Sequence, residues 1–158
     1  MNNFNRMIQL AQEVFAAHND PMQLDVDEHI IEQLKQLHPA TISEYVDVDG
    51  PVLWVIIIPT THALMHEFID GKISETELLS KTPLQSQYDA LYLCSAMVLN
   101  EYRKKGLAKQ FTLAAIQAIR KQHQIKNLFV WAFTPEGNAL AESIAKQENL
   151  PLLKRERK

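Results

Sequence analysis

The 158-residue chain is poor in cysteine and in glycine, and it has no long apolar segment. Cys94 is the only cysteine, which excludes an intrachain disulfide and a multi-cysteine zinc site and favours a reducing compartment. The longest apolar run, residues 52–58, is far shorter than the roughly 20 residues of a membrane-spanning helix. The N-terminal residues also lack the apolar core of a secretory signal. We therefore expect a cytoplasmic protein that does not act in a membrane.

An excess of basic residues is missing as well. The formal net charge of −3 argues against broad nucleic-acid binding. His62 and His66 have the spacing of two metal ligands on a helix, but no third ligand is evident, so no metal is expected. The length and the 46% hydrophobic content fit one globular unit, and we expect a single domain over residues 1–158. The oligomeric state is left open, a homodimer included.

Hydrophobic periodicity predicts helices and strands that alternate in the second half of the chain, which favours a mixed sheet with helices on its faces. The expected helices are 3–18, 28–38, 62–70, 75–80, 107–123 and 138–148. The expected strands are 41–48, 52–58, 91–99, 128–133 and 150–153. The turn at residues 49–50 is expected to join the first two strands as a hairpin.

Three local signals predict where helices begin. Asp25 and Glu28 resemble a capping box, and Ser74 with Glu77 forms a second one. Asn138 is expected to cap the last helix.

Two elements have a predicted inward face. In the strand 41–48 it comprises Ile42, Val46 and Val48. In the helix 107–123 it comprises Leu107, Phe111, Ala114, Ala115, Ala118 and Ile119.

The junction between the strand 91–99 and the following helix predicts an anion site. Arg103, Lys104 and Lys105 stand at the start of that helix, where the helix dipole already places about half a positive charge. Three cations are favourable there if an anion binds the free backbone N–H groups. The chain has only four glycines, against roughly 11 at average usage, so we expect Gly106 to let the backbone approach a ligand closely.

The junction lacks the P-loop pattern Gly-x-x-x-x-Gly-Lys-Ser/Thr and the Rossmann pattern Gly-x-Gly-x-x-Gly. Residues 103–108 read Arg-Lys-Lys-Gly-Leu-Ala, which resembles the pyrophosphate motif Gln/Arg-x-x-Gly-x-Gly/Ala of the GCN5-related N-acetyltransferases, the GNAT superfamily. The apolar strand before it, the helix after it, and an Asn-x-x-Ala at residues 138–141 follow the same order as in that family. The similarity covers about residues 91–150. It implies an α/β (α+β) fold with a mixed, mostly antiparallel sheet, splayed central parallel strands and helices on both faces.

The resemblance implies acetyl-CoA as co-substrate. Backbone groups of Val98 and Leu99 would bind the pantetheine arm, and the Leu99 N–H, or its neighbour, would polarise the thioester carbonyl. Backbone N–H groups from Arg103 to Ala108 would hold the pyrophosphate. The implied cofactor-binding residues are Val98, Leu99, Arg103, Lys104, Lys105, Gly106, Leu107, Ala108 and Asn138.

The implied reaction transfers an acetyl group to a primary amine of an unidentified acceptor, and it needs a proton acceptor and a proton donor. The family commonly has a catalytic tyrosine seven residues after its asparagine, where this chain has Ala145. Tyr92, near the position of a catalytic glutamate in some relatives, is the first substitute. Cys94 shares its side of the strand unless a bulge intervenes. A packed aromatic and an inert core thiol are the alternatives for these two residues.

Two other functions remain open. Ala145 keeps a catalytically inactive GNAT-fold module, which binds CoA or a partner protein, as an alternative. An unrelated α/β binding domain would have no splayed strands. Residues 60–87 exceed the tight hairpin usual in the family, and their helices would cover the acceptor side or complete the core. We expect residues 1–90 to form the variable acceptor-side half and residues 91–150 the CoA-binding half.

Overall fold

The computed structural model describes residues 2–18, 22–24, 27–132 and 134–156. Its longer helices are α1 (Asn3–His18), α2 (Glu28–Leu37), α3 (His62–Ile69), α4 (Glu75–Lys81), α5 (Leu107–Arg120) and α6 (Pro135–Glu148). Two 3-10 turns are η1 (Pro39–Thr41) and η2 (Asn100–Tyr102). The strands are β1 (Ile42–Asp47), β2 (Gly50–Thr60), β3 (Ala90–Val98), β4 (Asn127–Val130) and β5 (Leu152–Lys154).

The strands form one mixed sheet in the order β1-β2-β3-β4-β5. β1, β2 and β3 pair antiparallel, whereas β3–β4 and β4–β5 pair parallel. The antiparallel part has the longer ladders, because β2 has 11 residues and β4 only four. The expected mixed α/β sheet is confirmed.

The two central parallel strands pair over only the first part of β3. β3 and β4 pair from Ala90 with Asn127 to Leu93 with Val130, and the pairing stops there. β3 continues to Val98 with β2 as its partner. The splayed strands expected from the resemblance are therefore present, whereas an unrelated α/β domain was expected to lack them.

A register shift marks the point where the strands separate. Ile56 pairs with Ser95, but the next β2 residue, Ile57, pairs with Leu93, so Cys94 is an extra residue of β3. Such a bulge bends a strand and re-aims its side chains. The bend lies where β3 loses β4 as a neighbour.

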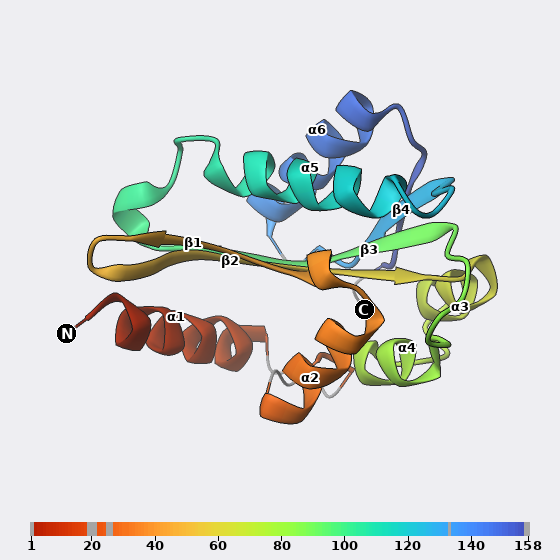
Figure 1. Ribbon diagram of the computed structural model, residues 1–158, viewed down its shortest axis with the longest axis horizontal. Helices are drawn as coiled ribbons and strands as arrows, with labels where there is room; N and C mark the ends of the chain where they lie inside the picture. Colours follow the sequence, from red (N-terminus) through yellow and green to blue (C-terminus); the bar gives the residue numbers. More distant parts are fainter. Residues whose placement is uncertain (1, 19–21, 25–26, 133, 157–158) are drawn as a thin grey trace.

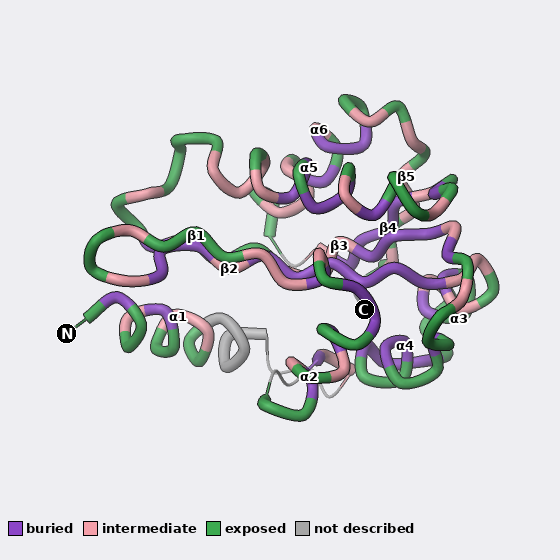
Figure 2. Tube along the Cα trace, viewed as in Figure 1, coloured by how far each residue is buried: buried purple, intermediate pink, exposed green. Residues whose placement is uncertain are grey.

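Helices cover both faces of the sheet (Figure 1). α5 and α6 lie on one face, and α1, α2 and α4 lie on the other, with α3 beside α4. Each helix buries its apolar stripe on the sheet, as layered α/β folds require. Buried residues run along β2, β3 and β4 between the two helical layers (Figure 2).

The segment between β2 and β3 supplies part of the core. Met65 and Phe68 of α3 and Leu78 of α4 are fully buried, and the Phe68 ring lies 4.8 Å from the Tyr92 ring and 5.9 Å from the Phe129 ring. α4 begins with the predicted capping box, in which Ser74 and Glu77 satisfy each other's backbone N–H groups. These helices therefore complete the core.

Three helix details differ from the sequence prediction. The cap of α2 is Asp27, whose side chain accepts from the Ile30 N–H, while residues 25–26 of the predicted box lie outside the described residues. α6 begins earlier than expected, with Thr134 as its cap. On α5, Ala114 is exposed. The buried face of α5 comprises Thr112, Leu113, Ala115, Ile116 and Ile119.

β1 also differs from its predicted pattern. Val46 and Val48 are 54% and 96% exposed rather than buried. A register shift between Tyr45 and Val46 breaks the alternation that would have turned Val46 inward, and Val48 lies in the turn after the end of β1. Across the described ranges, every helix is too short or too polar to span a bilayer.

Candidate functional site

A cleft of about 960 Å³ occupies the space between the separated strands. Gly106 and Leu107 line it from the α5 side, whereas Leu24 and Glu75 line it from the opposite side of the sheet. Cys94 and the following residues of β3 form the wall between them. The volume suits a sizeable small-molecule ligand. The cleft thus connects the two helical layers through the gap in the sheet.

The start of α5 presents unpaired backbone donors to this cleft. The first helical hydrogen bond of α5 runs from the Gln110 N–H to the Gly106 carbonyl, 2.9 Å, so the N–H groups of residues 107–109 have no acceptor within the helix. No described side chain caps this end. Arg103 and Lys104 line the same end of the cleft. Backbone donors and cations together make an electropositive site suited to a phosphate group.

The backbone of this turn explains why residue 106 is glycine. Gly106 is the N-cap of α5, and its φ is 74°. Only glycine adopts this left-handed conformation without steric cost. A Cβ placed at Gly106 would have no heavy atom within 4 Å, so the space beside it is open.

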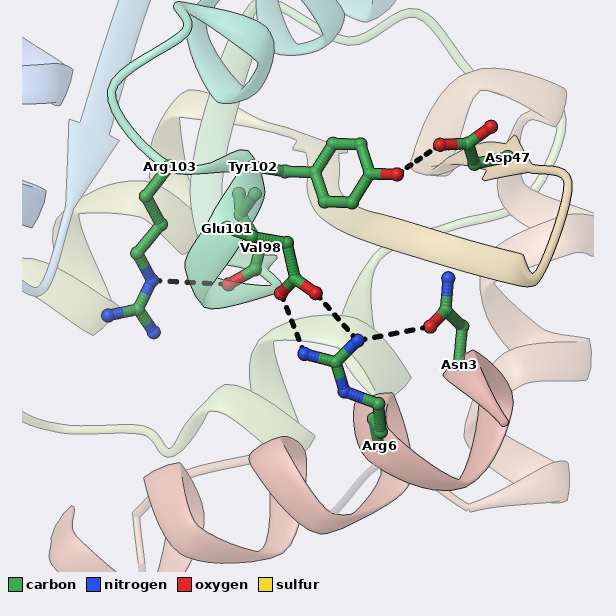
Figure 3. Close-up of polar contacts among 7 residues, drawn as sticks. All are labelled: Asn3, Arg6, Asp47, Val98, Glu101, Tyr102 and Arg103. Atoms are coloured by element: carbon green, nitrogen blue, oxygen red, sulfur yellow. Dashed lines mark hydrogen bonds and ion pairs between the residues drawn. The ribbon is translucent and has the colours of Figure 1, made fainter. Parts of the chain in front are cut away.

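At the end of β3, the backbone groups of one residue bond to β2 and those of the residue before it face the cleft. The Leu99 N–H donates to the Val52 carbonyl at 2.9 Å, so of the two expected donors to a thioester only its neighbour is left available. Neighbouring residues of a strand direct their backbone groups to opposite sides, so the Val98 groups face away from β2. The Val98 carbonyl accepts from Arg103 Nε at 3.2 Å (Figure 3).

Asn138 lies elsewhere than predicted. It follows the start of α6 instead of capping it, and its side chain donates to Glu142 Oε1 at 3.2 Å. The residues of α6 that line the cleft are Glu136, Gly137, Leu140, Ala141 and Ile144. Ala145, at the position of the family's tyrosine, is buried.

Tyr92 and Cys94, the two predicted catalytic residues, both contact the carboxylate of Glu75, which the sequence did not point to. The Tyr92 hydroxyl donates to Glu75 Oε2, and Cys94 Sγ lies 3.7 Å from the same oxygen. The Leu24 N–H donates to Glu75 Oε1 at 2.5 Å. Glu75 is the first residue of α4, and its only sequence signal was an acid in a helical first turn, where acids are common.

Burial controls the protonation of this cluster. Glu75 is only 5% exposed, and burial raises its pKa, against the lowering effect of its hydrogen bonds from Tyr92, Leu24 and Cys94. Burial and the Glu75 charge raise the pKa values of Tyr92 and Cys94 well above their ordinary values. Tyr92 and Cys94 therefore keep their protons and act as hydrogen-bond donors to Glu75.

Arg155 lies near this cluster on the same side of the sheet. Its guanidinium stacks 4.5 Å from the Phe68 ring and 4.2 Å from the Trp131 ring, and it donates to the Ile73 carbonyl at 2.8 Å. Its charge lowers the pKa of Glu75, but less than the hydrogen bonds do.

A polar network ties η2, which precedes the turn of residues 103–106, to the N-terminal half (Figure 3). Arg6 of α1 forms two hydrogen bonds with the Glu101 carboxylate, at 2.8 and 2.6 Å, and a third with Asn3 at 3.2 Å. The Tyr102 hydroxyl donates to Asp47 at the end of β1. Two adjacent residues of η2 are thus held from two different elements.

The Arg6–Glu101 pair is expected to make the stability of the fold depend on acid pH. The Arg6 hydrogen bonds lower the Glu101 pKa to about 2, so the pair stabilises the fold above the ordinary pKa of glutamate and this contribution disappears as the pH falls toward 2. Between about pH 6 and about pH 3, we expect the melting temperature of Glu101→Gln to fall less than that of the wild type. Glu32→Gln, at an exposed acid of α2, is the control and should behave like wild type. Identical losses in all three proteins, measured by thermal unfolding, would refute the contribution of this pair.

The His62 and His66 rings lie 4.9 Å apart on α3. Among the described residues, no group of three or more His, Cys, Asp and Glu side chains is arranged to hold a metal ion.

Comparisons with known proteins give a structural likeness without a sequence match. No protein-family model and no curated protein matches the chain. The NatB acetyltransferase complex bound to a bisubstrate inhibitor matches with a TM-score of 0.53 and 13% identity, over 80% of this chain and 61% of that one. The tetramutant of the BH1408 protein from Bacillus halodurans matches with a TM-score of 0.55 and 15% identity, over 99% of this chain and 92% of that one.

The fold is GNAT-like. At these identities the likeness concerns the fold alone, and the chain spans less than two thirds of the NatB chain it matches. The cleft between the splayed strands of this GNAT-like fold lies beside the turn whose sequence resembles the pyrophosphate motif.

Proposed function

We propose that this protein transfers an acetyl group from acetyl-CoA to a primary amine. The observation that carries the proposal is the cleft between β3 and β4, with an uncapped, cation-flanked helix start on one side of the sheet and a buried carboxylate on the other. A diphosphate needs donors and positive charge, whereas an amine acceptor needs a proton acceptor. The structural likeness to an acetyltransferase complex supports the same assignment.

The residues of the cleft fit CoA in two ways. Backbone N–H groups from Lys104 to Ala108 would hold the diphosphate, since the Arg103 N–H already donates to the Asn100 carbonyl at 3.2 Å. The Arg103 and Lys104 side chains line the cleft and would add charge. Lys105 would add charge from outside its lining, where its Nζ lies 5.3 Å from the centre of the Tyr102 ring. The Val98 backbone groups face the cleft side of β3 and would bind the pantetheine arm, once Arg103 Nε releases the Val98 carbonyl.

An unpaired polar atom in the cleft also indicates a ligand. Ser95 lines the cleft, and its buried Oγ has no hydrogen-bond partner among the described residues. Buried hydroxyls are normally paired, so this one suits a hydrogen bond to a bound molecule.

The two substrates are proposed to bind to different halves of the chain. We assign residues 91–150 to acetyl-CoA and residues 1–90 to the acceptor, within a single domain. Leu99 stays in the proposed site through its carbonyl, and Tyr92 and Cys94 stay in it through their contacts with Glu75. The contact of Asn138 with the cofactor stays a prediction, although its side chain bonds Glu142 here. The lone cysteine supports a cytoplasmic location.

Calorimetric titration with acetyl-CoA, CoA and ATP in parallel tests the cleft. We expect acetyl-CoA and CoA to bind with micromolar affinity, and ATP to fail to reproduce this binding, because it lacks the pantetheine arm that β3 would recognise. Comparable binding of ATP would mean that the site recognises only phosphate. Absence of binding by all three would refute the proposal.

Release of free thiol from acetyl-CoA in the presence of a panel of amines tests the transfer itself. Binding of acetyl-CoA without amine-dependent thiol release would favour the alternative suggested by Ala145, a GNAT-fold module that binds CoA without catalysis.

A further inference from the structure

The Glu75 carboxylate lies beside the bulge of β3, in the cleft that the separated strands border. Glu75 and Cys94 both line the cleft, and Cys94 is the extra residue at the β3 bulge. β3 loses β4 as its neighbour immediately beside this position. Glu75 belongs to α4, on the face of the sheet opposite α5 (Figure 1), and it lines the same cleft as the start of α5.

The surroundings of Glu75 are costly for a purely structural carboxylate. Within the described ranges no Lys, Arg or His forms an ion pair with it, and its three hydrogen-bond donors are the uncharged Tyr92, Cys94 and Leu24 N–H. A buried carboxylate without a cationic partner is expensive to keep charged. Such a group in a cleft is a candidate for proton transfer.

We propose that Glu75 accepts a proton from the ammonium group of the acceptor and thereby produces the amine that attacks acetyl-CoA. This assignment rests on the proposed function. Tyr92 and Cys94 are positioning residues in this scheme: they hold the carboxylate at the bulge and do not themselves donate to the substrate.

The step balances as follows. Glu75 takes one proton from the ammonium, and the freed nitrogen lone pair forms a bond to the carbonyl carbon of the acetyl thioester. The tetrahedral adduct breaks its carbon–sulfur bond, and the thiolate of CoA leaves with the pair of electrons. The second proton on nitrogen passes to that sulfur, giving an amide and CoA thiol, and Glu75 returns its proton to water.

The raised pKa of Glu75 supports this role, because a base is most effective when its pKa lies near the working pH. The titratable groups that face Glu75 are Tyr92 and Cys94 of β3, with Arg155 after β5 at longer range. Since Tyr92 and Cys94 keep their protons, Glu75 is the group of this cluster that can accept one.

Two probe nucleophiles distinguish the loss of a proton acceptor from a general loss of the folded site. 2-Phenylethylamine is a cation at neutral pH and must lose a proton before attack, whereas hydroxylamine is mostly uncharged and need not. We expect Glu75→Gln to lower kcat/KM for 2-phenylethylamine by about 100-fold or more, and to lower it much less for hydroxylamine. Acetyl-CoA affinity, measured by calorimetry, should stay at the wild-type value.

Glu77→Gln is the matched control. Glu77 is an exposed acid of the same helix, and glutamine preserves a capping box, so this variant should retain wild-type rates with both nucleophiles.

The pH profile of Tyr92→Phe is a second, independent readout. The Tyr92 hydrogen bond lowers the Glu75 pKa, so removing it should move the acidic limb of kcat/KM for 2-phenylethylamine to higher pH. An unchanged limb in this variant, or equal losses for both nucleophiles in Glu75→Gln, would overturn the role of Glu75 and leave the proposed transferase function standing. A wild-type protein that binds acetyl-CoA but transfers to neither nucleophile would overturn the transferase function as well.

Discussion

We expect Gly106→Glu to abolish acetyl-CoA binding with little loss of the fold. Gly106 lies at the uncapped start of α5, and a side chain there would enter open space beside the cleft. Glutamate would add bulk and a negative charge where the diphosphate is proposed to lie. Losing two or more charge-assisted hydrogen bonds costs about 3 kcal/mol or more, so affinity should fall at least about 100-fold in calorimetry.

Gly106→Ala is the control for the backbone. Because the φ of 74° is unfavourable for any residue with a Cβ, both variants carry a strain of roughly 1–2 kcal/mol, visible as a similar fall in thermal stability. The alanine variant should keep most of the acetyl-CoA affinity. An unchanged affinity in Gly106→Glu would remove the α5 turn from the binding site.

The largest effect on stability is expected for Phe68→Ala. Phe68 is fully buried in α3, its ring contacts the Tyr92 and Phe129 rings, and the Arg155 guanidinium covers it. Truncating a buried phenylalanine leaves a cavity and costs about 3–5 kcal/mol. Urea denaturation should show a loss of that size in the free energy of unfolding.

Phe4→Ala provides the comparison at an exposed phenylalanine. Phe4 is 54% exposed and makes one edge contact with Trp54, so its loss should cost no more than about 1 kcal/mol. Equal, small effects of the two substitutions would mean that the helices between β2 and β3 are not part of the cooperative core. That result would also weaken the placement of Glu75, which the same segment carries.

Elements governed by neighbouring residues could be predicted well. The bounds of α1 agree with the predicted helix, and the Ser74–Glu77 capping box is present as expected, because periodicity and capping depend on residues within one or two turns. The cation-flanked glycine turn before α5 was evident for the same reason. The inward faces of β1 and α5 were less predictable, since a register shift and packing against the sheet decided them.

The cluster of hydrogen bonds around Glu75 could not be predicted, because its members are distant in sequence. Leu24, Glu75 and Tyr92 are 51 and 17 residues apart, and each alone has an ordinary explanation as an apolar, helix-starting or packed residue. Only the packing of α4 under the bulge of β3 brings them together.

The sequence by itself therefore determined the alternation of helices and strands and the electropositive turn of residues 103–108, since both arise from short-range patterns of charge, glycine and hydrophobicity. The tertiary structure decided where β3 and β4 separate, which backbone groups of Val98 and Leu99 remain available, and that Tyr92 and Cys94 face a buried Glu75. These features depend on pairing register and on contacts between distant segments, whose free energies no local pattern of residues encodes.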